Sequence, residues 1–68
     1  SFKDQLIASA IYDLSVSLFR KPGIADLDEV QKAELFRQIR YRFSADPAQI
    51  ARVCEVTYDE VCALLESV

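Results

Sequence analysis

The segment from Phe2 to Arg20 constrains the fold more than any other part of this 68-residue chain. Its apolar residues recur at three- and four-residue steps, which is the period of an α-helix. One apolar row contains Leu6, Ile7, Ala10, Ile11, Leu14 and Leu18, and a second row contains Ala8, Tyr12, Val16 and Phe19. The polar remainder is a narrow strip of Ser9, Asp13, Ser17 and Arg20. We therefore expect a helix over residues 2–20 that is apolar on more than one side.

Such a helix has two interpretations. Either it is buried on nearly every side, or one row packs inside while the other pairs with another protein chain. Hydrophobic residues make up 51% of the sequence, and a core this small rarely contributes more than ~3–5 kcal/mol of stability. We favour the second interpretation, with a homo-oligomer or a protein partner bound through an interface on the second row. The predicted interface residues are Ala8, Tyr12, Val16 and Phe19.

Three more helices account for the rest of the chain, and no strand-like alternation competes with them. Lys21-Pro22-Gly23 is expected to end the first helix, because proline disfavours a helical residue before it and glycine relaxes the turn. The second helix is expected from about Asp26 to Phe43, with Asp26 and Glu29 in capping-box spacing. Its core row contains Leu35, Phe36, Ile39 and Phe43, whereas Leu27, Val30 and Tyr41 lie off that row.

The third and fourth helices begin at recognisable signals. Asp46-Pro47 is a strong start, because aspartate caps and proline at the first helical position loses no hydrogen bond. That helix runs to about Cys54, and Thr57, with Glu60 three residues later, starts the fourth. The sequence thus predicts one all-α domain of four helices over residues 1–68, either a whole protein or one domain of a longer one.

Residues 46–66 carry a further pattern. Ala51 is small enough for two helices to approach closely, and Val56 can fill the turn between them. The residues expected in the shared core are Ile50, Cys54, Val61 and Leu64. This segment resembles the helix-turn-helix of prokaryotic regulators and mobile-element proteins. The resemblance implies a trihelical core over residues 26–68, an additional helix over residues 2–20, and association with nucleic acid.

Two features depart from that family. Glu55 occupies the turn position where the family most often has glycine, so we expect it to adopt positive φ at a cost of ~1 kcal/mol. The recognition-helix face implied by the resemblance is Thr57, Tyr58, Asp59, Cys62, Ala63 and Glu66. This face has none of the Arg, Lys, Asn or Gln side chains that make most bidentate base contacts, and phosphates repel its two carboxylates. It is better suited to docking a protein.

The net charge of −3 is unevenly distributed. Basic residues concentrate in residues 31–52, whereas residues 53–68 contain four acidic residues and no basic one: Glu55, Asp59, Glu60 and Glu66. The candidate contacts to nucleic acid or an acidic partner are Arg37, Arg40, Arg42 and Arg52. The alternative is a solvated helix face with local ion pairs, such as Arg42 to Asp46. Two functions therefore stay open: a regulatory or mobile-element module that associates with nucleic acid through this basic flank and acts as an oligomer, or a protein-interaction domain that does not read DNA.

Other functional classes lack candidate residues. The chain has no histidine, and its two cysteines, Cys54 and Cys62, are too few for a four-ligand zinc site. No serine or cysteine lies beside a candidate base, and no glycine-rich loop could bind phosphate. We expect no enzymatic activity, no metal and no cofactor. No apolar run reaches the length of a membrane span, and cysteines among apolar residues fit buried thiols in a reducing cytoplasm.

Overall fold

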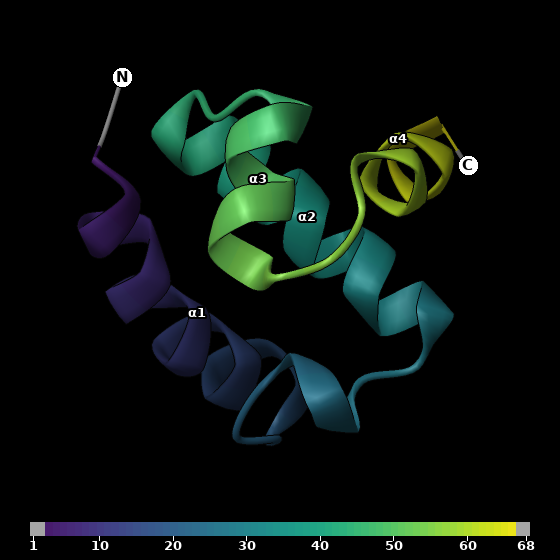
Figure 1. Cartoon of the computed structure of the whole chain (residues 1–68). Coiled ribbons are helices and arrows are strands. Elements are labelled where there is room, and N and C mark those ends of the chain that lie inside the picture. The colour runs from purple at the N-terminus through teal and green to yellow at the C-terminus, as the bar shows by residue number, and fades with distance from the viewer. Residues whose placement is uncertain (1–2, 67–68) are drawn as a thin grey trace.

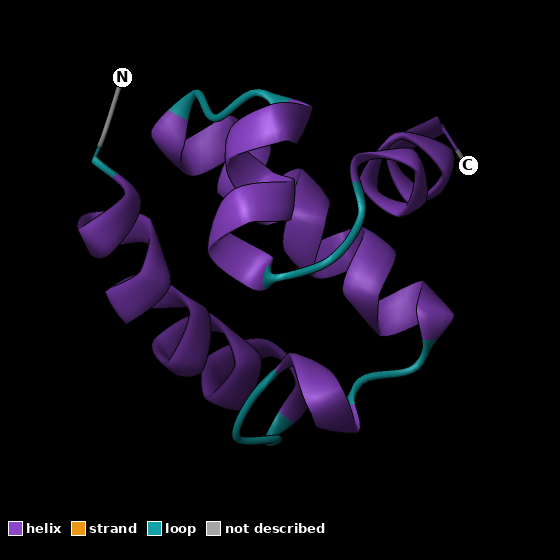
Figure 2. Ribbon diagram, viewed as in Figure 1, coloured by secondary structure: helices purple, strands orange, loops and turns teal. Residues whose placement is uncertain are grey.

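The computed structural model describes residues 3–66, and it contains four α-helices and one 3₁₀ turn over that range (Figures 1 and 2). The elements in chain order are α1 (Asp4–Phe19), η1 (Ile24–Asp26), α2 (Glu29–Phe43), α3 (Pro47–Cys54) and α4 (Tyr58–Glu66). The predicted all-α class with four helices is confirmed. Phe2, which we placed in the first helix, and residues 67–68 lie outside the described residues.

The last three α-helices pack on one another, and α1 packs on α3 and α2. In Figure 1, α1 lies along one side of α2 and α3, and α4 lies on the other side. The side chains buried most completely in the shared core are Ile7, Leu35, Phe36, Ile39, Ile50 and Val61. One core therefore joins all four helices, with α2 and α3 between α1 and α4.

The second helix begins later than predicted. Asp28, rather than Asp26, is its cap: the Asp28 carboxylate accepts from the Gln31 backbone N–H at 2.8 Å, and the Gln31 side chain accepts from the Asp28 backbone N–H at 3.1 Å. The predicted box of Asp26 and Glu29 was wrong because η1 occupies Ile24–Asp26. Leu27, between the two elements, is only 7% exposed. Leu27 therefore belongs to the core, although it lies off the apolar row predicted for the second helix.

Left-handed backbone ends three of the helices, and none of the residues concerned is glycine. They are Arg20, Ser44 and Glu55, at the ends of α1, α2 and α3. The first helix ends where the sequence predicted, but the reversal falls on Arg20. The Arg20 N–H donates to the Val16 carbonyl at 2.9 Å, and the Lys21 N–H donates to the Ser15 carbonyl at 3.3 Å. Gly23 has an extended backbone with φ of 178°. For Glu55, the expected positive φ is confirmed at 59°.

The caps of α3 and α4 are also confirmed. The Asp46 carboxylate accepts from the Gln49 backbone N–H at 2.8 Å, and Pro47 follows at the first helical position. The Thr57 hydroxyl accepts from the Glu60 backbone N–H at 3.0 Å. Between the two helices, Ala51 is buried and its carbonyl accepts from the Val56 N–H at 3.1 Å. The turn thus brings α3 and α4 together through the residues that the sequence indicated.

Candidate functional site

The outer face of α1 exposes apolar side chains. Tyr12 is 58% exposed and Val16 is 40% exposed, and Ala8, one turn before Tyr12, is exposed as well. We call Ala8, Tyr12 and Val16 the α1 strip. The fourth residue predicted for this interface, Phe19, is half-buried and packs against the core. The structure therefore leaves three of the four predicted residues uncovered on one helix.

The row of α1 predicted to be buried is covered only in part. Ile7 and Leu14 are buried, and Ala10 and Ile11 pack partly against the core. Two further members of this row, Leu6 and Leu18, are 55% and 38% exposed, so their predicted burial was wrong. The physical reason is that α1 packs mainly on α3 and α2, which leaves side chains near both ends of the helix with little to cover them.

The start of α1 is held to α3 by a polar contact. Both carboxylate oxygens of Asp4 accept from the Arg52 guanidinium, at 2.8 and 3.1 Å, and Oδ1 also accepts from the Gln49 side chain at 3.0 Å. These hydrogen bonds, first from Arg52 and then from Gln49, lower the pKa of Asp4 to about 2. Arg52 is thereby engaged within the chain. No short-range pattern could have indicated the contact, because Asp4 and Arg52 are 48 residues apart.

The other predicted arginines fall on two sides of α2. Arg37 and Arg40 line an open groove between α2 and α4, together with Tyr41 and Leu65. Arg42 lines a different groove, which α1 forms with the end of α2. The four predicted basic residues therefore do not form one surface. Arg37 and Arg40 share a groove, and the most exposed aromatic ring described, Tyr41 at 87%, lies beside them.

The polar contacts of these arginines differ too. Arg37 is paired with Glu34 at 3.2 Å, and the Glu34 carboxylate also accepts from the Gln38 side chain at 3.0 Å. Hydrogen bonds from Gln38 and then Arg37 lower the pKa of Glu34. Arg42 donates to the Gln38 side chain at 3.0 Å and not to Asp46, so the expected pair of Arg42 and Asp46 does not form. Within residues 3–66, the Arg40 side chain has neither a hydrogen bond nor an ion pair.

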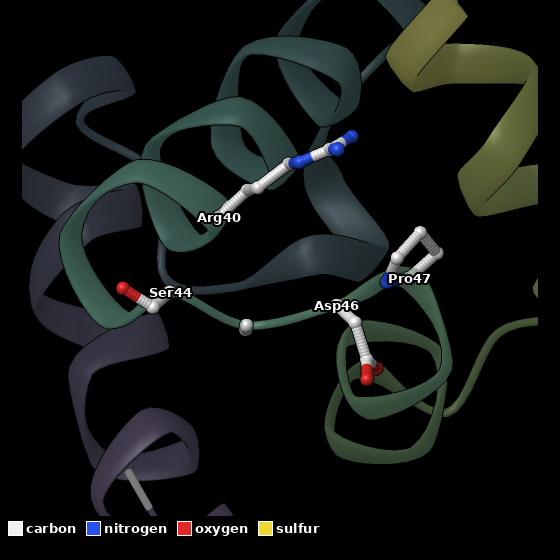
Figure 3. Close-up of a pocket in the computed structure, with 5 residues that line it drawn as sticks. Arg40, Ser44, Asp46 and Pro47 are labelled. Atoms are coloured by element: carbon white, nitrogen blue, oxygen red, sulfur yellow. The ribbon is translucent and has the colours of Figure 1, made fainter. Parts of the chain in front are cut away.

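Arg40 also borders the turn between α2 and α3. It lines a small pocket of about 270 Å³ with Ser44, Ala45, Asp46 and Pro47 (Figure 3). In Figure 3 the Arg40 side chain extends away from the turn, whereas the Asp46 carboxylate points toward the helix that it caps. The Arg40 guanidinium is thus free to contact a ligand at the surface, whereas the nearby Asp46 carboxylate caps α3.

The face of α4 predicted from the resemblance is exposed and acidic. Thr57, Tyr58, Asp59, Ala63 and Glu66 are exposed, and Cys62 is half-buried. On the other side of α4, Glu60 accepts from Lys32 at 3.0 Å, which raises the pKa of Lys32 and joins α4 to α2. The contact of Tyr58 with the Cys62 thiol raises the pKa of the Tyr58 phenol. No basic side chain on this face offsets its two carboxylates.

No group of three His, Cys, Asp or Glu side chains among residues 3–66 is placed to hold a metal ion. Burial raises the pKa of the Cys54 thiol to about 12, which keeps it protonated and a poor nucleophile at neutral pH. None of the helices described has both the length and the apolar character needed to cross a membrane.

Comparison with known proteins found no matching family model, no matching curated protein and no matching solved structure. The surfaces that bear on function are the α1 strip, the groove beside Arg40 and the acidic face of α4.

Proposed function

We propose that this domain is a protein-interaction module that self-associates through α1 and uses its helix-turn-helix-like scaffold as a support rather than as a reader of duplex DNA. The observation that carries the proposal is the exposed apolar strip of Ala8, Tyr12 and Val16. The helix that bears it is anchored to the domain by its opposite face and by Asp4. An anchored helix presents such a strip as a rigid surface for another chain.

A second copy of this chain is the partner that the strip fits best. The strip contains no charged residue, so two copies meet without like-charge repulsion. In a two-fold pair the same patch serves both copies, and Tyr12 lies at the centre of the strip. Pairing two α1 helices antiparallel then stacks Tyr12 on Tyr12, brings Ala8 against Val16, and opposes the two helix dipoles favourably.

The size of the strip limits the strength of this association. From Ala8 to Val16 the helix rises roughly 12 Å, so the contact area is smaller than that of most permanent dimers. We expect a reversible dimer whose population rises with concentration, and whose dissociation constant is on the order of micromolar.

The first prediction is that Tyr12→Glu and Val16→Glu each convert the dimer into a monomer. In the Tyr12→Glu dimer, two carboxylates would face each other across the two-fold axis. In the Val16→Glu dimer, each carboxylate would be buried among apolar side chains without a partner. Sedimentation equilibrium from low to high micromolar concentration measures the loss of the dimer, and far-UV circular dichroism checks that the helices remain.

Val30→Glu is the matched control, because Val30 is also an exposed apolar residue but lies on α2, away from the strip. It should leave the dimer unchanged. A wild-type chain that stays monomeric at high micromolar concentration would overturn the proposal. Unfolding of the Tyr12→Glu variant would instead show that α1 is buried by its own domain.

Duplex DNA is disfavoured by the charge of α4. Asp59 and Glu66 lie on the face that would enter the major groove, and Arg52, the basic residue of α3, is paired with Asp4. A DNA-reading helix needs donors to base edges and positive charge near phosphates. The scaffold resembles that of DNA-binding proteins, but a fold does not determine a function.

A further inference from the structure

The groove between α2 and α4 has a chemistry that self-association through α1 does not use. Its described lining consists of two arginines, one tyrosine and one leucine: Arg37, Arg40, Tyr41 and Leu65. The arginines are three positions apart on one helix, a spacing that places side chains on the same face. The groove therefore combines two guanidinium groups with a ring that is almost fully exposed.

The charge of this groove is only partly neutralised. Glu34 pairs with Arg37 at 3.2 Å, and this exposed pair is weak in water. Arg40 has no carboxylate partner among residues 3–66, and the nearby Asp46 caps α3. A free guanidinium is a strong binder of phosphate, because its planar donors match two phosphate oxygens at once.

The Tyr41 ring distinguishes between anionic ligands. A ring this exposed, in the last turn of α2, contributes little to folding and is open to a flat partner. Nucleic-acid bases stack on such rings, and sites for single strands combine stacking with positive charge along the backbone. An acidic peptide would use the arginines but would gain little from stacking on Tyr41.

The neighbouring acidic face favours a single strand over a duplex. Asp59 and Glu66 are exposed carboxylates on α4, and they would repel the phosphates of a duplex that lies across both helices, whereas a single strand can follow α2 alone. We propose that Arg37, Arg40 and Tyr41 form a binding site for single-stranded nucleic acid, in which the arginines contact phosphates and Tyr41 stacks on a base.

Fluorescence anisotropy with a labelled oligothymidine of about 12 nucleotides tests the site on the full chain. We expect binding at ~50 mM salt that weakens about sevenfold by ~200 mM, because two phosphate contacts each contribute a slope of about 0.7. Arg40→Gln should remove one contact and lower that slope by about 0.7. Tyr41→Ala should weaken binding at least about fivefold by removing one stacked base.

Arg42→Gln is the matched control, because it removes the same charge from the same helix but on the side that faces α1. It should leave the affinity unchanged. Circular dichroism verifies the fold of each variant, and all three positions are exposed. The proposal is overturned by absence of binding at ~50 mM salt, by an equal loss with Arg42→Gln, or by polyglutamate competing as well as oligothymidine. The last result would assign the groove to an acidic protein.

Discussion

At the residue scale, the three left-handed helix ends are the main departure from ordinary sequence rules. Arg20, Ser44 and Glu55 adopt φ values of 59°, 53° and 59°, a region that costs a residue with a Cβ about 1 kcal/mol. The chain has one glycine, and its backbone is extended instead. The fold therefore stores conformational strain at each of these turns, and the turn between α3 and α4 is one of them.

This strain predicts that Glu55→Gly stabilises the domain. Glycine adopts positive φ without steric cost, although its unfolded state is more flexible, so we expect a net gain of about 0.5–1 kcal/mol. Urea denaturation measures the gain as a higher midpoint with an unchanged slope. Glu55→Ala, which keeps the Cβ, is the control and should give no gain. A destabilised glycine variant would show that the Glu55 side chain has a stabilising role.

Ser15 is a second residue whose local chemistry works against folding. It is completely buried in α1, and its hydroxyl has no hydrogen-bond partner among residues 3–66. A buried polar group without a partner costs about 1–3 kcal/mol. We expect Ser15→Ala to raise the unfolding free energy by about 1 kcal/mol, because alanine removes that cost and favours the helix. Thermal unfolding at neutral pH measures the change, and a lower melting temperature would contradict the prediction.

At the scale of elements, α1 is attached to α3 by polar contacts at its start and by apolar packing along one side. The hydrogen bonds to Asp4 lower its pKa to about 2, so the folded state favours the carboxylate. That contribution to stability is complete above the ordinary range of an aspartate and is lost as pH falls from about 4 to about 2. Because the pair is exposed, its contribution is modest.

Asp4→Asn should therefore lower stability at neutral pH slightly and flatten the loss of stability between about pH 4 and 2. Denaturation midpoints measured across that range compare the variant with the wild type. Asp13→Asn is the control, because Asp13 is an exposed carboxylate on the same helix with no polar partner among residues 3–66. If Asp4→Asn and wild type lose stability in parallel on acidification, the contact does not stabilise the domain.

At the scale of the whole molecule, the chain is about as compact as a monomer of its size should be. Its accessible surface is 4442 Å², close to the roughly 4,300 Å² expected for a monomer of this mass. The exposed apolar side chains of α1 therefore reflect where these residues lie on the surface and not a loosely packed chain. We infer that self-association through the α1 strip adds an interaction and is not required for folding, which is why the Tyr12→Glu variant should stay helical.

Local signals were sufficient for much of the fold. The helical period, the caps at Asp46 and Thr57 and the left-handed Glu55 could be predicted because each depends on neighbours within a few residues. The two apolar rows of α1 were compatible with complete burial or with an exposed row, and the exposure of Ala8, Tyr12 and Val16 agrees with the interpretation that we favoured. The start of α2 was misplaced because Asp26 and Asp28 offer competing caps, and only the 3₁₀ turn excludes Asp26.

The tertiary structure decided how the charged residues are grouped. By itself, the sequence determined that the chain is helical and that α1 has more apolar surface than one packing face can cover. The separation of Arg42 and Arg52 from the groove of Arg37 and Arg40 depends on which helices cross. That crossing joins Asp4 to Arg52 across the length of the chain. Such contacts depend on the packing of the whole core, which no local sequence pattern encodes. The tertiary structure was therefore needed to show which arginines belong to the same candidate binding surface.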